Sequence, residues 1–450
     1  MASTSQRMSN VDTAWLRMDD PTNLMMISGL ILFKEPLEKA DLRRVIENRL
    51  LKFDRFRQRI VGLDRLFGNP RWEDDPHLDL DYHIQEITLP APGDATVLRH
   101  VVGQFMSQPL DFAHPLWQIH LIRNYQQGCA VLVRIHHCIA DGIALVRVLL
   151  SLTDTQADAS ASTTPALQHP SRNNTGGGLT NGTSGWLQSL KMGAVKLYSL
   201  ARLTLQKPDP RTLFKGKLGV AKIPAWSAPL PLDEVKQIGK TLGATVNDVL
   251  LSVVSGALRQ YLLKRGEQIP PDLNIRAAVP FNLRPPEDAI RLGNEFGLLF
   301  LSLPLSIEDP VERLKEVKRR SLELKRSVQS QVVFGVLNLI GMVPRAIQKL
   351  VVNFFGTKIT AVMTNVPGPQ HPIYLAGKEV ETILFWVPQS GRTGMGVSIF
   401  SYNHHVYIGL ATDAGLVPEP AEIIQELHNE YDRLREATRA QEHLPPAETA

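Results

Sequence analysis

The most informative part of the chain is Val131-Leu132-Val133-Arg134-Ile135-His136-His137-Cys138-Ile139-Ala140-Asp141-Gly142. Its first half is an apolar run typical of a buried strand. After Gly142, apolar residues recur at helical spacing, namely Ile143, Val146, Leu149 and Leu150. The pattern predicts a strand that ends in two histidines and a helix that begins near Asp141. Because side chains alternate along a strand, His136 and His137 should point to opposite faces.

A histidine at a strand end suits proton transfer, because imidazole exchanges a proton near pH 7. Such a base can activate a hydroxyl for attack on an activated acyl group. Two other interpretations remain open at this point. The histidines could be hydrogen-bonded structural residues, or His137 and Asp141 could share a metal ion. Zinc normally needs three or four ligands, and the other histidine pair, His404-His405, lies in a separate strand-like segment.

Composition narrows the class of protein. The chain has 450 residues, enough for two domains, and its 43% of hydrophobic residues is typical of globular proteins. The net charge of +4 does not indicate a nucleic-acid partner, but it suits anionic lipid headgroups or coenzyme phosphates. With Cys129 and Cys138 as the only cysteines, we expect a reducing, cytoplasmic location. No apolar run reaches the roughly 20 residues that span a bilayer.

The chain divides by composition into four parts. We expect an N-terminal domain over residues 1–152, a linker with a helix over 153–214, a second domain over 215–440 and a tail over 441–450. Residues 153–185 are rich in Ser, Thr, Asn and Gly and predict a flexible linker. Residues 186–206 predict a basic amphipathic helix, which either packs on the second domain or contacts a membrane surface. The apolar segment 332–355 is a second candidate for peripheral membrane contact.

Further short motifs follow one another along the chain. They are Asp12-Thr13-Ala14-Trp15, Pro115-Leu116-Trp117, Asn247-Asp248, Val279 to Arg284, Leu292 to Gly297, and Thr364 to Pro369. With the His-His-x-x-x-Asp-Gly sequence, they make the chain resemble the bacterial wax ester synthase/diacylglycerol acyltransferase (WS/DGAT) family. That family belongs to the superfamily of chloramphenicol acetyltransferase and peptide-synthetase condensation domains. The resemblance covers nearly the whole chain.

The resemblance implies both a fold and a reaction. The fold is α/β, with two chloramphenicol-acetyltransferase-like domains, mixed sheets flanked by helices, and an active-site tunnel at their interface. The reaction transfers a long-chain acyl group from acyl-CoA to a fatty alcohol or to diacylglycerol, without a metal or redox cofactor. Two alternatives remain open. One is an acyltransferase with a different alcohol or a polar acceptor, and the other is a non-catalytic protein that binds lipid droplets.

The resemblance also assigns roles to residues. His137 is the implied general base, with His136 beside it and Asp141 as a structural carboxylate, and no acyl-enzyme is required. The residues expected to shape the site are Gly142, which would allow a tight turn, Arg284 as the partner of Asp141, Pro115, Trp117, Asn247 and Asp248. The candidate substrate-binding residues are Asn282, Asn294, Asn365 and Gly368. Candidate donors to the oxyanion are amides near Gly142 and the side chain of Asn282.

Overall fold

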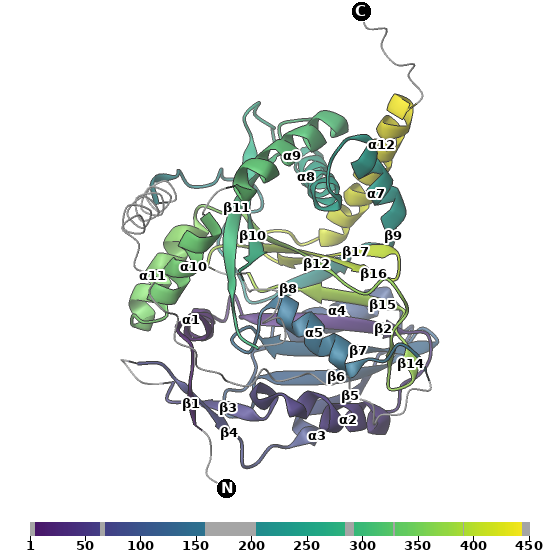
Figure 1. The fold of residues 1–450 in the computed structure, drawn as a ribbon. Coiled ribbons are helices and arrows are strands. Elements are labelled where there is room, and N and C mark those ends of the chain that lie inside the picture. The colour runs from purple at the N-terminus through teal and green to yellow at the C-terminus, as the bar shows by residue number, and fades with distance from the viewer. Residues whose placement is uncertain are drawn as a thin grey trace, which may run out of the picture.

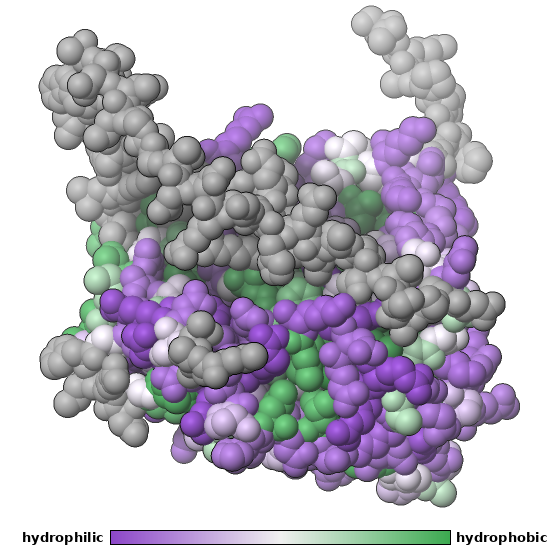
Figure 2. Space-filling view, turned by 60° about the horizontal axis from the view of Figure 1, so that its bottom comes forward, coloured by the Kyte–Doolittle hydropathy of each residue, from purple (hydrophilic) through white to green (hydrophobic). Residues whose placement is uncertain are grey.

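A computed structural model describes residues 5–63, 68–157, 204–283, 292–326, 329–389 and 391–442. Two β-sheets lie one above the other, and most helices cover their outer sides (Figure 1). Figure 2 shows that one face of the molecule is mainly hydrophilic, with hydrophobic residues exposed in separate patches. The predicted linker at 153–185 and the predicted helix at 186–206 fall mostly outside the described residues.

The first sheet carries the histidine motif on its central strand. Its strand order is β15 (Thr382–Trp386), β2 (Met26–Phe33), β7 (Gly128–His136), β6 (Trp117–Tyr125) and β5 (Ile84–Thr88). Strand β7 is antiparallel to both neighbours, and Met26 pairs with His136 at its end. The apolar run before His136 is therefore a strand enclosed by the sheet, as the sequence predicts.

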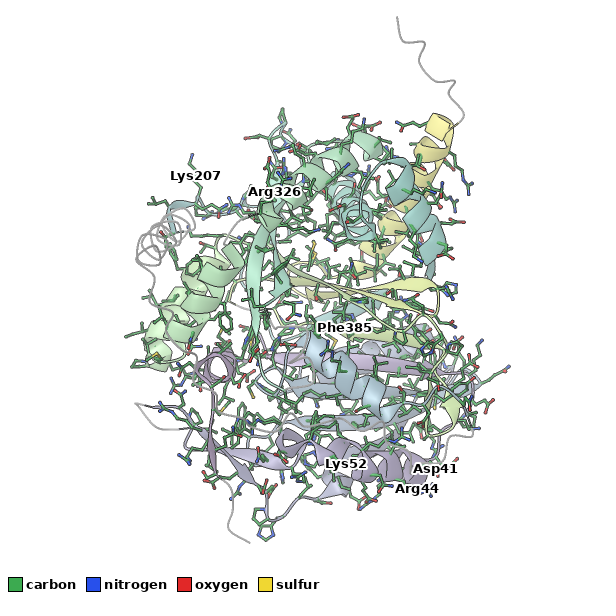
Figure 3. All side chains as sticks on the ribbon, in the orientation of Figure 1. Asp41, Arg44, Lys52, Lys207, Arg326 and Phe385 are labelled. Atoms are coloured by element: carbon green, nitrogen blue, oxygen red, sulfur yellow. The ribbon has the colours of Figure 1, made fainter. Side chains whose placement is uncertain are left out.

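Strand β15 comes from the C-terminal half of the chain but completes the first sheet. It pairs antiparallel with β2, from Thr382 opposite Leu32 to Trp386 opposite Ser28. Its Phe385, labelled in Figure 3 where the two sheets meet, also contacts the ring of Phe400 in the second sheet. The first sheet thus includes a strand from the segment 215–440, which the sequence assigned to the second domain.

The second sheet is mixed. Its order is β11 (Phe296–Pro304), β10 (Asn274–Asn282), β12 (Ala361–Pro367), β16 (Met395–Tyr402), β17 (His405–Asp413) and β8 (Lys222–Trp226), and β9 (Leu230–Pro231) also pairs with β17. Strand β12 is parallel to β10 and β16, and the other pairs are antiparallel. Smaller sheets are formed by β1 (Gln6–Arg7), β4 (Arg71–Asp74) and β3 (Gln58–Val61), and by β13 (Tyr374–Leu375) and β14 (Lys378–Glu379).

The helices cover these sheets and flank their junction (Figure 1). In the first half they are α1 (Asn10–Met18), α2 (Lys39–Asn48), α3 (Leu80–His83), α4 (Ala95–Met106) and α5 (Gly142–Leu152). In the second half they are α7 (Leu232–Thr241), α8 (Val246–Lys264), α9 (Pro310–Lys325), α10 (Gln329–Ile340), α11 (Arg345–Gly356) and α12 (Pro420–Glu442). In the described chain no single helix is long and apolar enough to cross a membrane, and only the sharply bent pair α7–α8 passes such a test jointly.

Candidate active site

His137 lies directly after β7 and is enclosed by aromatic side chains from both halves of the protein. Its backbone N–H donates to the Met25 carbonyl over 2.7 Å. Its ring stacks on Trp15 of α1, with centroids 4.1 Å apart, and tilts against Phe296 of β11 at 5.7 Å. Only 6% of His137 is exposed. The imidazole is therefore fixed at the junction between the two halves.

Burial decides the charge of this imidazole. It lowers the pKa of His137 to about 4, although the backbone carbonyl of His137 and the Asp141 carboxylate act in the opposite direction. His137 is consequently neutral at pH 7. A neutral imidazole can accept a proton from a hydroxyl, which is the property that a general base needs.

Asn294 ties the backbone of His137 to α1. Its Nδ2 donates two hydrogen bonds of 2.8 Å, one to the His137 carbonyl and one to Asp12 Oδ1. Both Nδ2 hydrogens are thus used within the protein, and Asn294 is only 4% exposed. Burial raises the pKa of Asp12, while the hydrogen bond from Asn294 lowers it. Sequence reasoning expected Asn294 to bind substrate, but these contacts are those of a positioning residue.

Asp141 is the N-cap of α5 and a link to the second half. One of its carboxylate oxygens accepts the N–H of Ala144 at 3.0 Å, and the other accepts the N–H of Glu295 at 3.2 Å. The Asp141 N–H donates to the carbonyl of Gly293, whose φ of +126° favours glycine. Asp141 therefore couples the histidine turn to the loop before β11. Its expected partner, Arg284, lies outside the described residues.

His136 has a separate set of neighbours. Its Nδ1 accepts the N–H of Cys138 at 3.2 Å, and its Nε2 lies 3.6 Å from Asp19 Oδ1. The edge of its ring meets Phe112. Asp19 also accepts the N–H of Met25. The two histidines thus have different surroundings, in agreement with the alternation expected along a strand.

Gly142 and the Pro115-Leu116-Trp117 motif both lie beside the histidine turn. Gly142 is the first residue of α5, its φ is not in the left-handed region, and a Cβ there would meet nothing within 4 Å. The expectation that Gly142 allows a tight turn is therefore wrong, and the missing side chain leaves open space instead. Trp117 is buried, stacks on His83 and donates to the Phe56 carbonyl, while Pro115 is buried beside it.

The other candidates lie in the second half. Asn365 donates to Asn247 at an exposed position, and Asp248 completes the capping box of Thr245 at the start of α8. In the described part of the chain, neither asparagine hydrogen-bonds to His137. Gly368 packs so closely on β16 that a Cβ would lie 2.4 Å from the Phe400 ring, so the position has no room for a side chain. Asn282 is an exposed residue at the end of β10.

Sequence reasoning gave no role to Trp15, Asp12, Phe296 or Asp19. A signal existed for the first two, because Asp12 and Trp15 are three residues apart and share one face of a helix. That face is apolar apart from Asp12, which is a reason to look for its partner. Among the described residues, no group of three or more His, Cys, Asp or Glu side chains could hold a metal ion.

Comparisons with known proteins place this site in a family. Residues 8–250 match the wax ester synthase/diacylglycerol acyltransferase catalytic domain, and residues 292–435 match the WS/DGAT C-terminal domain. Probable diacylglycerol O-acyltransferase tgs1 of Mycobacterium tuberculosis is 27% identical, over 95% of each chain. Putative diacylglycerol O-acyltransferase Rv1760 of the same organism is 25% identical, over 92% of this chain and 87% of that protein.

Solved structures agree on the fold. The wax ester synthase/diacylglycerol acyltransferase from Marinobacter aquaeolei VT8 aligns with a TM-score of 0.72 at 22% identity, over 96% of this chain and all of that one. The starter condensation domain of rhizomide synthetase RzmA aligns with a TM-score of 0.62 at 14% identity, over 97% of this chain and 95% of that one. The α/β fold with two acyltransferase-like domains that the sequence predicts is therefore confirmed. The chain belongs to the wax ester synthase/diacylglycerol acyltransferase family.

Proposed function

We propose that this O-acyltransferase moves a long-chain acyl group from acyl-CoA to the hydroxyl of diacylglycerol or of a fatty alcohol, with His137 as the general base. The observation that carries the role of His137 is its buried, neutral imidazole, held by Trp15 and by the bond from Asn294 to its own carbonyl. Membership of the family supports the reaction class. The names of the mycobacterial relatives favour diacylglycerol among the acceptors.

The reaction needs one proton carrier. His137 takes the hydroxyl proton, the oxygen bonds to the thioester carbonyl carbon, and collapse of the tetrahedral intermediate breaks the carbon–sulfur bond. The coenzyme A thiolate leaves and recovers the proton from the imidazolium. The first two N–H groups of α5, of Gly142 and Ile143, hydrogen-bond to no group in the described chain. They lie at the positive end of the helix dipole and are our candidates to stabilise the oxyanion.

A covalent acyl-enzyme is not needed. Cys138 is the cysteine beside the base, but burial raises its pKa well above the ordinary value. Its thiol is therefore protonated at pH 7, and the thiolate is the nucleophilic form. We accordingly assign direct transfer from coenzyme A to the acceptor.

Replacement of His137 tests this mechanism. General-base catalysis supplies about 10²–10⁴-fold in rate, so His137→Ala should lose turnover by that order. The measurement is thiol release from palmitoyl-CoA with diacylglycerol, with hexadecanol and without acceptor. His77→Ala removes an exposed histidine and should match the wild type. Near-normal turnover of a folded His137→Ala protein would contradict the role of His137. Absence of thiol release by the wild type with every acceptor would favour a non-catalytic lipid-binding protein.

We also propose peripheral docking on the cytoplasmic surface of a membrane or lipid droplet. Five large apolar residues of the α10–α11 segment are between 42% and 71% exposed, namely Leu339, Met342, Ile347, Leu350 and Phe354. We call them the α10–α11 apolar face. Arg345 and Lys349 lie on the same helix as three of them, so anionic lipid would attract this face electrostatically before the apolar side chains enter the interface.

Sedimentation with anionic vesicles tests the docking surface. Leu339→Ser/Leu350→Ser should reduce the bound fraction, because these two side chains are the most exposed of the face. Leu263→Ser, which changes a 40% exposed leucine on α8, is the matched control. High salt should release part of the wild-type protein, since it screens the basic residues. Equal binding of all three proteins would assign docking to another surface, and recovery only with detergent would argue for integral insertion.

A further inference from the structure

A cavity of about 1120 Å³ lies where α1, residues 208–218, α11 and the 391–392 loop meet. Its walls carry seven basic and three acidic side chains, which is an excess of four positive charges. We call it the basic cavity. Its volume lies slightly above the roughly 300–1,000 Å³ typical of pockets for small ligands and cofactors, so it has room for a large one. Such a concentration of like charge in a concave site favours an anionic ligand.

Some of these basic side chains already have partners within the protein. Arg345 donates to the Asp19 carbonyl, and Lys349 forms an ion pair of 3.1 Å with Asp20. Lys215 donates to the carbonyls of Thr357 and Ile359. Burial lowers the pKa of Lys215, and the neighbouring charge of Arg392 acts in the same direction. These residues form the wall of the cavity. Other basic residues of the cavity remain available to a ligand.

Three cations of the basic cavity have no such compensation. Arg211, Lys217 and Arg392 are exposed, and the described residues offer them neither an ion-pair nor a hydrogen-bond partner. They come from two segments that are far apart in the sequence. A cluster of unpaired cations that face one hollow suits a ligand with more than one phosphate.

The basic cavity lies close to the histidine turn. Asp19 lines it, and the carboxylate of Asp19 lies 3.6 Å from Nε2 of His136, the residue next to His137. The side chain of Asp19 therefore separates a ligand held in the cavity from His136. Of the substrates of the proposed reaction, only the acyl donor carries phosphates, since diacylglycerol and fatty alcohols are uncharged.

We propose that the basic cavity binds the nucleotide end of acyl-CoA, with Arg211, Lys217 and Arg392 contacting its 3′-phosphate and 5′-diphosphate. This inference rests on the proposed function, because it identifies the ligand from the donor of that reaction. A phospholipid headgroup shares the phosphate chemistry and is the competing source. The concave shape and the proximity of the cavity to the histidine turn, through Asp19, favour the coenzyme.

The test removes the three cations together, as Arg211→Ala/Lys217→Ala/Arg392→Ala. The control, Arg44→Ala/Lys52→Ala/Lys236→Ala, removes the same charge elsewhere. Figure 3 labels Arg44 and Lys52 at the lower edge of the molecule near α2, whereas α11, which lines the basic cavity, lies at its left side. Titration calorimetry measures binding of adenosine 3′,5′-bisphosphate, which needs no turnover. We expect about 10–100-fold weaker binding for the cavity variant and wild-type binding for the control.

Kinetics with two donors complete the test. For palmitoyl-CoA, the cavity variant should show a KM raised at least about tenfold with kcat unchanged. For palmitoyl-pantetheine, which lacks the nucleotide, it should match the wild type. Unchanged bisphosphate binding, or equal losses with both donors, would overturn the assignment. So would loss of anionic-vesicle binding with retained bisphosphate binding, which points to a lipid headgroup. If the wild type transfers no acyl group but binds the bisphosphate through these cations, the proposed acyl transfer is contradicted, whereas the phosphate-binding role of the basic cavity is supported.

Discussion

At the scale of single residues, the position of His137 depends on Asn294. Replacing Asn294 with alanine leaves the His137 carbonyl and the buried Asp12 carboxylate without their shared donor. A buried group that loses its partner typically costs about 1–3 kcal/mol. We therefore expect Asn294→Ala to lower the free energy of unfolding by that amount. It should also lower kcat more than it changes KM, because the base is displaced while the substrate sites remain.

Denaturant unfolding and steady-state kinetics on the same preparations check this prediction. Asn429→Ala removes an exposed asparagine on α12 and should change neither quantity. An Asn294→Ala protein with wild-type stability and kcat would show that the contacts with Trp15 and Phe296 hold the ring without Asn294.

The sequence predicts the histidines and Asp141 of the site, but it does not predict the residues that hold them in position. The His136-His137 pair and Asp141 lie in one short segment, where strand and helix periodicity determine their arrangement. Asn294 is 157 residues away from His137, and its role appears only when the two halves meet. An asparagine in a loop carries no local sign of whether its amide will face a substrate or a backbone carbonyl.

At the scale of elements, two glycines distinguish open space from close packing. A Cβ at Gly368 would lie 2.4 Å from the Phe400 ring and 2.5 Å from the Ser401 carbonyl, whereas one at Gly142 would meet nothing within 4 Å. Gly368→Ala should therefore push β12 and β16 apart and cost about 1–3 kcal/mol, in the range of overpacked cores. Gly142→Ala should fold with near-normal stability and is the matched control. Thermal unfolding of the two variants is the measurement, and equal melting temperatures would contradict the close contact.

Periodicity identified β7 and α5 correctly. It could not assign β15 to the first sheet. The five residues from Thr382 to Trp386 are apolar or β-branched and would fit either sheet, so their partner is decided by tertiary packing. The sequence therefore predicts a single domain over residues 215–440, although one of its strands, β15, pairs with β2 in the first sheet.

At the scale of the whole molecule, buried histidines make stability depend on pH. Burial lowers the pKa of His83 to about 4, of His120 to about 3 and of His137 to about 4. In the unfolded chain these groups bind protons below about pH 6.5, whereas the folded protein keeps them neutral until near pH 4. The unfolded state binds more protons in this window. Stability is therefore full above pH 6.5 and is lost as the pH falls toward 4.

His120→Gln isolates one of these contributions. Between pH 7 and pH 4.5, the wild type should lose about 2–3 kcal/mol more than the variant, because glutamine does not titrate. Denaturant midpoints at the two pH values give this difference, and His77→Gln controls for an exposed histidine. Parallel pH profiles of the wild type and His120→Gln would mean that His120 is hydrated or already paired in solution.

The pairing of β15 with β2, which joins the C-terminal half of the chain to the first sheet, has a consequence for biosynthesis. Strand β2 leaves the ribosome roughly 350 residues before the strand that covers its outer edge. At 5–20 residues per second, the nascent chain presents that edge for roughly 20–70 s. The segment Met26–Phe33 is almost entirely apolar, and an unpaired apolar edge is a template for association between chains. A message truncated before codon 382 therefore yields a polypeptide that chaperones must hold, and that pairs with its own copies when they do not.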